Sequence, residues 1–139
     1  IASDRATDHV LALGDLQYEE GELANFRRYY DPAMGAGPGL KSRTLPVPGN
    51  HEYLTEGASG YFDYFGALAG DRSKGYYAKP LGTWRLVVAN TGLPTGEGKP
   101  TEAFMRWQQV SQTSPKFDIG TIIANGCSTF QTTPSPVPA

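Results

Sequence analysis

Four short apolar runs divide the chain, and each has a length typical of a buried strand. The runs are Val10 to Leu13, Leu45 to Pro48, Arg85 to Asn90 with its Leu-Val-Val-Ala centre, and Ile119 to Ala124. Near-continuous apolar residues bounded by turn residues are typical of strands that are buried on both faces. The pattern therefore predicts a β-sheet with covered faces, in which Arg85 to Asn90 is a central strand.

Two further segments show helical spacing. Apolar residues recur every three or four positions in Glu22 to Tyr30 and in Glu102 to Ser111, with polar residues between them, which predicts amphipathic helices that cover the sheet. Asp31-Pro32 is expected to end the first helix, and the Gly/Pro-rich segments 33–42 and 91–101 are expected to be loops. Strands and helices in this order predict an α/β fold, a mixed β-sheet with flanking helices.

The segment from Thr55 to Gly66 is rich in aromatic residues, and the end of the chain is rich in proline. We expect the first to be a lid element whose aromatic side chains pack as a core or lid cluster, with a wall for stacking a substrate as the secondary interpretation. Residues 132–139 contain three prolines and predict an extended tail or linker. The predicted organisation is one domain over 1–131 and a tail over 132–139.

Composition limits the classes of partner. The chain has 139 residues, enough for one core, and a formal net charge of −2, which gives no basic field for nucleic acid. Its single cysteine cannot form an internal disulfide. No apolar run is long enough to predict a membrane span. We therefore expect neither a nucleic acid nor a membrane as partner.

Polar residues follow the first two apolar runs directly. Gly14-Asp15 comes after the first run, and Gly49-Asn50-His51 comes after the second, where Gly49 permits a tight turn. Ligands of open α/β sheets collect at the carboxyl ends of strands. The pattern predicts one side of a two-metal hydrolase site, with Asp15 as the bridging ligand and Asn50 as a second ligand.

These blocks, Gly14-Asp15 and Gly49-Asn50-His51-Glu52, together with aromatic segments downstream, resemble the calcineurin-like metallophosphoesterases. The resemblance covers about Asp8 to Trp107 and is strongest to the secreted bacterial branch related to purple acid phosphatases. It implies a two-sheet sandwich, a phosphate ester as substrate and hydrolysis by metal-activated hydroxide. It also implies iron, zinc or manganese as divalent or trivalent metal ions, and a secreted or periplasmic location.

The resemblance also implies roles for single residues. His51 corresponds to the histidine that contacts the phosphoryl group and protonates the leaving oxygen, with a solvated loop histidine as the alternative. Gly14-Asp15-x-x-Tyr18 matches the block whose tyrosinate binds ferric iron, although a packed aromatic is an equal alternative for Tyr18. Glu52 either orients His51 or is a loop carboxylate in water.

Several blocks of the family pattern are missing. The chain contains two histidines, His9 and His51, and lacks the first block and the two histidine-bearing last blocks. Cys127 stands near the position where a ligand histidine would be expected, and a small buried residue is the favoured interpretation. These gaps predict a partial domain, completed by a missing segment or a partner chain. The second hypothesis is a truncated or degenerate module that acts in binding or in a larger assembly.

Overall fold

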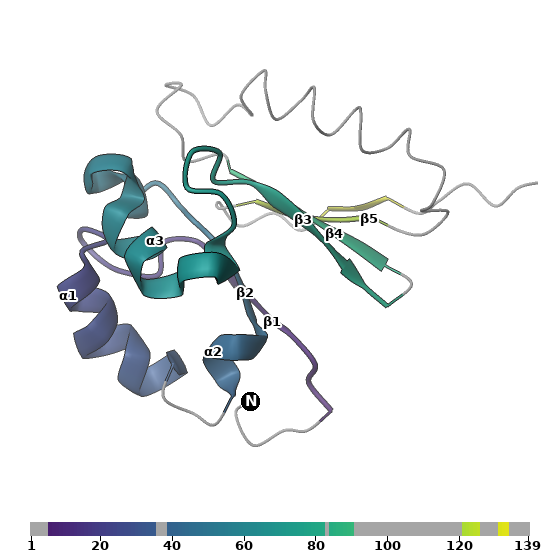
Figure 1. The fold of residues 1–139 in the computed structure, drawn as a ribbon, viewed down its shortest axis with the longest axis horizontal. Coiled ribbons are helices and arrows are strands. Elements are labelled where there is room, and N and C mark those ends of the chain that lie inside the picture. The colour runs from purple at the N-terminus through teal and green to yellow at the C-terminus, as the bar shows by residue number, and fades with distance from the viewer. Residues whose placement is uncertain (1–5, 36–38, 83, 91–120, 126–130, 134–139) are drawn as a thin grey trace, which may run out of the picture.

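A computed structural model describes residues 6–35, 39–82, 84–90, 121–125 and 131–133, the last two ranges by their backbone alone. The helices gather on one side, the larger sheet lies on the other, and β1 and β2 run between them (Figure 1). The strands are β1 (Val10–Leu13), β2 (Thr44–Val47), β3 (Tyr77–Leu81), β4 (Trp84–Ala89), β5 (Thr121–Asn125) and β6 (Gln131–Thr133). This arrangement confirms the general α/β class.

The described strands form two sheets. β1 and β2 pair in parallel, whereas the second sheet has the order β3-β4-β5-β6. Within it β4 and β5 are parallel, and the β3–β4 and β5–β6 pairs are antiparallel. β4 lies inside this sheet, as its apolar run predicts.

The helical segments are short. They are α1 (Leu23–Asn25), a π-helical stretch Phe26–Gly35, α2 (Leu40–Arg43), α3 (Ser59–Phe65), and the 3-10 turns Glu52–Leu54, Glu56–Ala58 and Gly66–Ala69. Among the described residues, no helix has the length and apolar character needed to cross a membrane.

The first helix ends later than predicted. It continues past Asp31-Pro32 to Gly35, so the prediction that this pair ends the helix is wrong. Tyr30 is buried, and the Tyr64 hydroxyl donates a hydrogen bond to Asp31 Oδ1 at 2.6 Å. These tertiary contacts hold the chain helical where the local sequence favours a stop.

Two other boundaries also differ. The predicted loop 33–42 contains the end of this helix and the start of α2, and Leu40 is buried there. The predicted tail begins inside β6, where Thr132 and Thr133 pair with β5. The predicted loop 91–101, the predicted helix Glu102 to Ser111 and residues 134–139 lie outside the described residues.

The two sheets contact each other through aliphatic side chains. Leu45 and Val47 of β2 pack against Leu86 and Val88 of β4 in one buried cluster. The Tyr77 hydroxyl of β3 donates a hydrogen bond to the Pro46 carbonyl oxygen at 2.9 Å, which adds a polar link between the sheets. This contact fixes β2, and therefore the loop that follows it, against the larger sheet.

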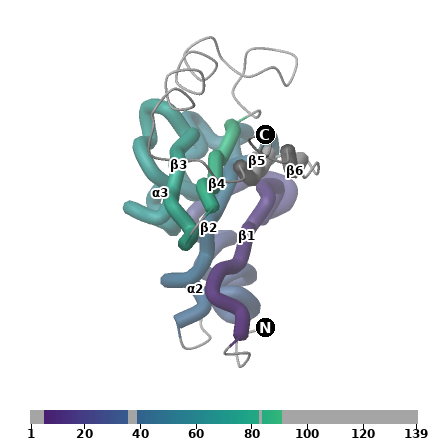
Figure 2. Tube along the Cα trace, turned by 90° about the vertical axis from the view of Figure 1, so that its right-hand side faces the viewer, coloured from purple at the N-terminus to yellow at the C-terminus, as the bar shows by residue number. Residues whose placement is uncertain are grey.

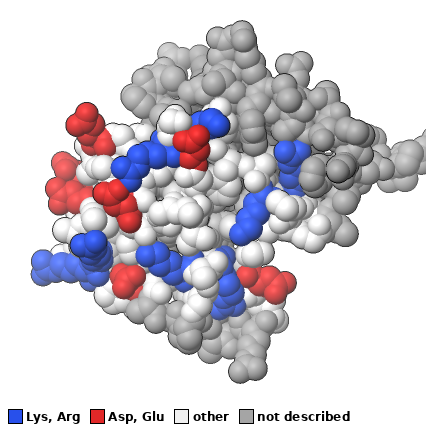
Figure 3. Space-filling view, viewed as in Figure 1, with Lys and Arg blue, Asp and Glu red and all other residues white. Residues whose placement is uncertain are grey.

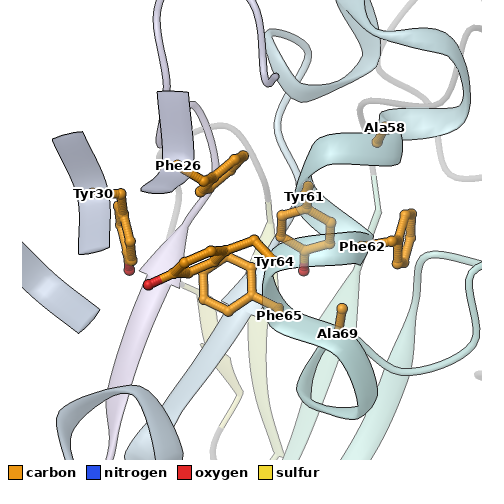
Figure 4. Packing of buried hydrophobic residues seen from close by; sticks show 8 residues of the cluster. All are labelled: Phe26, Tyr30, Ala58, Tyr61, Phe62, Tyr64, Phe65 and Ala69. Atoms are coloured by element: carbon orange, nitrogen blue, oxygen red, sulfur yellow. The ribbon is translucent and has the colours of Figure 1, made fainter. Parts of the chain in front are cut away.

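The predicted lid element is instead the centre of the helical core. A second buried cluster joins α3 to the first helix, and Figure 4 shows its aromatic rings converging between these elements. Its members are Phe26, Tyr30, Ala58, Tyr61, Phe62, Tyr64, Phe65 and Ala69. The core interpretation of the aromatic segment is therefore confirmed.

Two tyrosines of this core should respond oppositely to loss of the hydroxyl. The Tyr61 hydroxyl is buried and has no hydrogen-bond partner among the described residues, whereas the Tyr64 hydroxyl bonds Asp31. Tyr61→Phe is expected to leave stability unchanged or raise it, whereas Tyr64→Phe should lower it by about 1 kcal/mol. Urea denaturation of both variants checks the sign, and a stability loss in Tyr61→Phe as large as that in Tyr64→Phe would contradict the packing described here.

Candidate functional site

The ends of β1 and β2 bring the two polar blocks together. Leu13 pairs with Val47 at the end of the parallel ladder, so Gly14-Asp15 and Gly49-Asn50 leave the sheet at the same edge. Figures 1 and 2 both show the two strands side by side. The sequence-based placement of these loops on adjacent strand ends is thus observed.

The two loops approach so closely that Gly49 has no room for a side chain. A Cβ atom on Gly49 would lie 2.2 Å from Asp15 Oδ1 and 2.5 Å from the Asp15 nitrogen. Asp15 itself has φ +49°, a left-handed conformation that is uncommon for a residue with a side chain. The His51 N–H donates a hydrogen bond to Asp15 Oδ1 at 3.2 Å. Asp15 and His51 are therefore in direct contact.

Glu52 joins both loops from the inside. It is fully buried, and its carboxylate accepts four backbone N–H groups. Oε2 accepts from Asp15 at 2.8 Å and from Gly49 at 2.6 Å, while Oε1 accepts from Leu16 at 2.6 Å and from Gln17 at 3.3 Å. Hydrogen bonds to a charged group contribute about 1.5–3 kcal/mol each. We call Glu52 with these four donors the carboxylate clasp.

The clasp differs from both sequence-based interpretations of Glu52. The carboxylate neither lies in water nor contacts the His51 ring; it binds main-chain groups of both loops. A signal was present in the sequence, because Glu52 stands three residues after Gly49 at the start of a helical turn. That spacing lets the glutamate reach back to the Gly49 N–H, over the same three residues as in a capping box, although His51 is the N-cap of this turn.

The His51 ring has a defined orientation. Its Nδ1 lies 2.7 Å from the Glu19 carbonyl oxygen. A carbonyl oxygen only accepts, so Nδ1 carries the proton and the neutral ring has its acceptor at Nε2. Nε2 is therefore the atom that can contact a bound anion or transfer a proton.

Tyr18 lies against this histidine. The ring centroids of Tyr18 and His51 are 4.3 Å apart with an interplanar angle of 55°, and Tyr18 is 62 % exposed. Partial loss of hydration and then the negative charge of Asp15 raise the pKa of Tyr18, so the phenol is protonated at neutral pH. The Tyr18 ring thus contacts His51 while most of its surface stays exposed, and the role of Tyr18 as a metal ligand stays a prediction.

A polar contact that the sequence did not single out links this region to the larger sheet. Asn90 follows β4, is buried, and its Nδ2 donates a hydrogen bond to the Tyr53 hydroxyl at 2.6 Å. Burial raises the pKa of Tyr53, and the hydrogen bond from Asn90 opposes that shift. Gly75 approaches Asn90 so closely that a Cβ atom would lie 2.1 Å from Nδ2. An asparagine directly after a buried strand, as at Asn50, was the available signal.

The metal-binding prediction needs correction. In the part of the chain that the structure describes, no group of three or more His, Cys, Asp or Glu side chains can hold a metal ion. Asn50 is exposed, and Asp15 Oδ1 is already bonded to the His51 N–H. Metal binding by Asp15, Tyr18 and Asn50 as a set stays a prediction, and Cys127 lies outside the described residues.

Comparison with curated proteins gives a short similarity to a hydrolase. A haloalkane dehalogenase of Psychrobacter cryohalolentis is 44 % identical over 45 residues, which are 32 % of this chain and 15 % of that protein. No family model matches the chain. No solved structure matches it either. The named relative is a hydrolase of a family other than the calcineurin-like phosphoesterases, so its name contradicts the description of the chain as a metal-binding phosphatase.

Proposed function

We propose that this chain is an incomplete phosphoesterase-like domain whose β1–β2 edge forms one wall of a site for a phosphate ester. The observation that carries the proposal is the contact between the two blocks, in which the His51 N–H donates to Asp15 Oδ1 across adjacent strand ends. The residues that resemble the calcineurin-like superfamily are the residues that meet here. The contact between the two sheets also agrees with the layered architecture that the resemblance implies.

His51 is the residue that we assign to the phosphoryl group. With Nδ1 held by the Glu19 carbonyl oxygen, Nε2 faces away from that contact and can bind an anion when the ring is protonated. The same protonated ring can donate its Nε2 proton to a leaving oxygen. Asp15 supports this role through the His51 backbone and does not need to touch the substrate.

The described donors do not suffice for metal chemistry. Two cations held about 3.5–4 Å apart need a set of ligands larger than Asp15, Asn50 and Tyr18 provide. Iron, zinc or manganese would therefore require ligands from beyond the described residues or from a partner chain. We assign no reaction step to a metal ion.

Binding of a phosphate ester would depend on local donors. Figure 3 shows basic and acidic side chains interspersed on the visible described surface, and the net charge of the chain is −2. Long-range attraction of an anion is weak on such a surface. Specific recognition would therefore come from the strand-end loops.

Weak or undetectable turnover is expected when the chain is assayed alone with an aryl phosphate and added manganese, zinc or iron. Loss of supporting ligands costs on the order of 10–100-fold in metal affinity or activity, and several are absent among the described residues. The assay compares the native chain with Asp15→Asn and His51→Ala, with exposed Glu56→Gln as the matched control. Robust turnover that either site substitution abolishes would show that further residues complete the site.

The second candidate function is a non-catalytic module of the same fold. The shortage of metal-ligating side chains among the described residues favours it. Equilibrium binding of a phosphate ester tests whether the chain has a phosphoryl site at all, with or without catalysis. Binding that His51→Ala weakens supports a phosphoryl site, and no binding by the native chain contradicts it.

A further inference from the structure

We propose that Glu52 is the positioning residue of this site, and that its buried carboxylate fixes the Asp15 and His51 loops in one arrangement. The inference deepens the proposed function and rests on it for what the site binds. Its geometric basis is independent of that function, because the carboxylate clasp joins residues 15–17 to Gly49 through four backbone N–H groups. Glu52 thus acts on the site through the main chain.

The clasp supports a conformation that Asp15 would not readily adopt alone. Asp15 has φ +49°, and the preceding Gly14 has φ +83°. In this conformation the Asp15 N–H points to Glu52 Oε2 while its own Oδ1 accepts the His51 N–H. Loss of the Glu52 acceptor would remove the contact that opposes relaxation of Asp15 toward extended backbone.

The same loop also holds the His51 ring and backbone. The Gly21 N–H donates to the His51 carbonyl oxygen at 3.2 Å, and the Glu19 carbonyl oxygen lies 2.7 Å from His51 Nδ1. A Cβ atom on Gly21 would lie 2.6 Å from the Glu52 Cα, so the loop packs directly on Glu52. Residues 15–21 therefore wrap around His51 and Glu52, and the buried carboxylate lies at the centre of that wrap.

Only a carboxylate of this length at position 52 can accept hydrogen bonds from all four backbone N–H groups. Two carboxylate oxygens offer about four acceptor sites, which match the four N–H groups. A glutamine keeps the shape but replaces one oxygen with an NH₂ group, which would face two N–H donors. An aspartate keeps the charge but is shorter by one methylene, so it cannot keep all four distances.

The test combines backbone NMR with phosphate binding. Amide spectra of the native chain, Glu52→Gln, Glu52→Asp and the exposed control Glu56→Gln are compared, and the affinity of each for inorganic phosphate is measured by titration. We expect low-field, slowly exchanging amide protons at Leu16 and Gly49 in the native chain, because they bond the carboxylate at 2.6 Å. Glu52→Gln should shift these signals and those of Asp15, and should lower phosphate affinity on the order of 10-fold.

For a positioning role, the amide signals of the aromatic core should stay in place in a folded Glu52→Gln chain while those of the site loops shift and phosphate affinity falls. If Glu52 only stabilised the fold, a folded Glu52→Gln chain would keep the native phosphate affinity. Glu52→Asp should give an intermediate phosphate affinity, and Glu56→Gln should match the native chain. If Glu52→Gln does not fold, the native spectrum decides, because ordinary shifts and fast exchange at Leu16 and Gly49 overturn the clasp.

Failure of the two proposals can be distinguished. No phosphate binding by the native chain, with the expected amide shifts in Glu52→Gln, overturns the proposed function and supports the positioning of the loops. Native phosphate binding that a folded Glu52→Gln chain retains in full overturns the positioning role and supports the proposed function.

Discussion

Phe26→Ala is expected to lower the free energy of unfolding by about 3–5 kcal/mol, the range for truncation of a buried aromatic residue. Phe26 is fully buried and stacks on Tyr64 with ring centroids 5.1 Å apart, while Phe65 and Tyr30 contact it edge-on at 5.8 Å. The substitution leaves a cavity between α3 and the first helix that rigid aromatic neighbours cannot fill. Urea denaturation followed by circular dichroism measures the loss.

Tyr29→Ala is the matched control for this substitution. Tyr29 lies in the same helix but is 56 % exposed, and its described ring contact is with Arg28, 5.2 Å from the centroid. An exposed cation–π contact contributes about 0.5–1 kcal/mol. Equal losses for the two variants would show that Phe26 does not belong to the core.

Gly49→Ala is expected to destabilise the chain by about 1–3 kcal/mol, because the new methyl group overpacks a closed region. The added Cβ would meet the Asp15 carboxylate and backbone at 2.2 and 2.5 Å, and the loop cannot move away without weakening the clasp on Glu52. Both the midpoint of urea unfolding and the amide signal of Asp15 should change.

Asn50→Ala controls for a change of side chain in the same loop. Asn50 is exposed, so its truncation should alter stability by less than about 0.5 kcal/mol. A Gly49→Ala chain as stable as Asn50→Ala would mean that the two strand-end loops lie farther apart than described.

Hydrophobic runs predicted the strands well, and burial is continuous in β2 and in most of β4, whereas only Ala12 is buried in β1. Val10 to Leu13 is β1, and the run around Leu86 to Ala89 is β4. β1 and β2 pair in parallel, so the polar blocks that follow them lie at the same edge, as the sequence predicted. The end of the first helix was predicted wrongly because the signal at Pro32 is local. The contact that overrides it, between Tyr64 and Asp31, joins residues 33 positions apart.

The sequence predicted where the candidate site lies, but it predicted few of the contacts between its residues. The glycines and polar residues after β1 and β2 identified the correct edge, since strand ends place their loops together. The role of Glu52 was predictable only in part. Its spacing from Gly49 indicates the local contact, whereas its bonds to residues 15–17 are long-range and involve backbone groups, which leave no matching residue type in the sequence. Tyr18 matched a metal-binding block, and the sequence did not predict the contact of its ring with His51.

The carboxylate clasp also determines which positions are free to change. All four of its donors are main-chain N–H groups, so the clasp itself does not depend on which side chains stand at positions 16 and 17. Proline is the exception, because it has no N–H to donate. Packing limits these positions separately, because Leu16 lies against the aromatic core and Gln17 is buried. The clasp therefore excludes proline at positions 16 and 17 and tolerates little change at Glu52, where one side chain serves both loops.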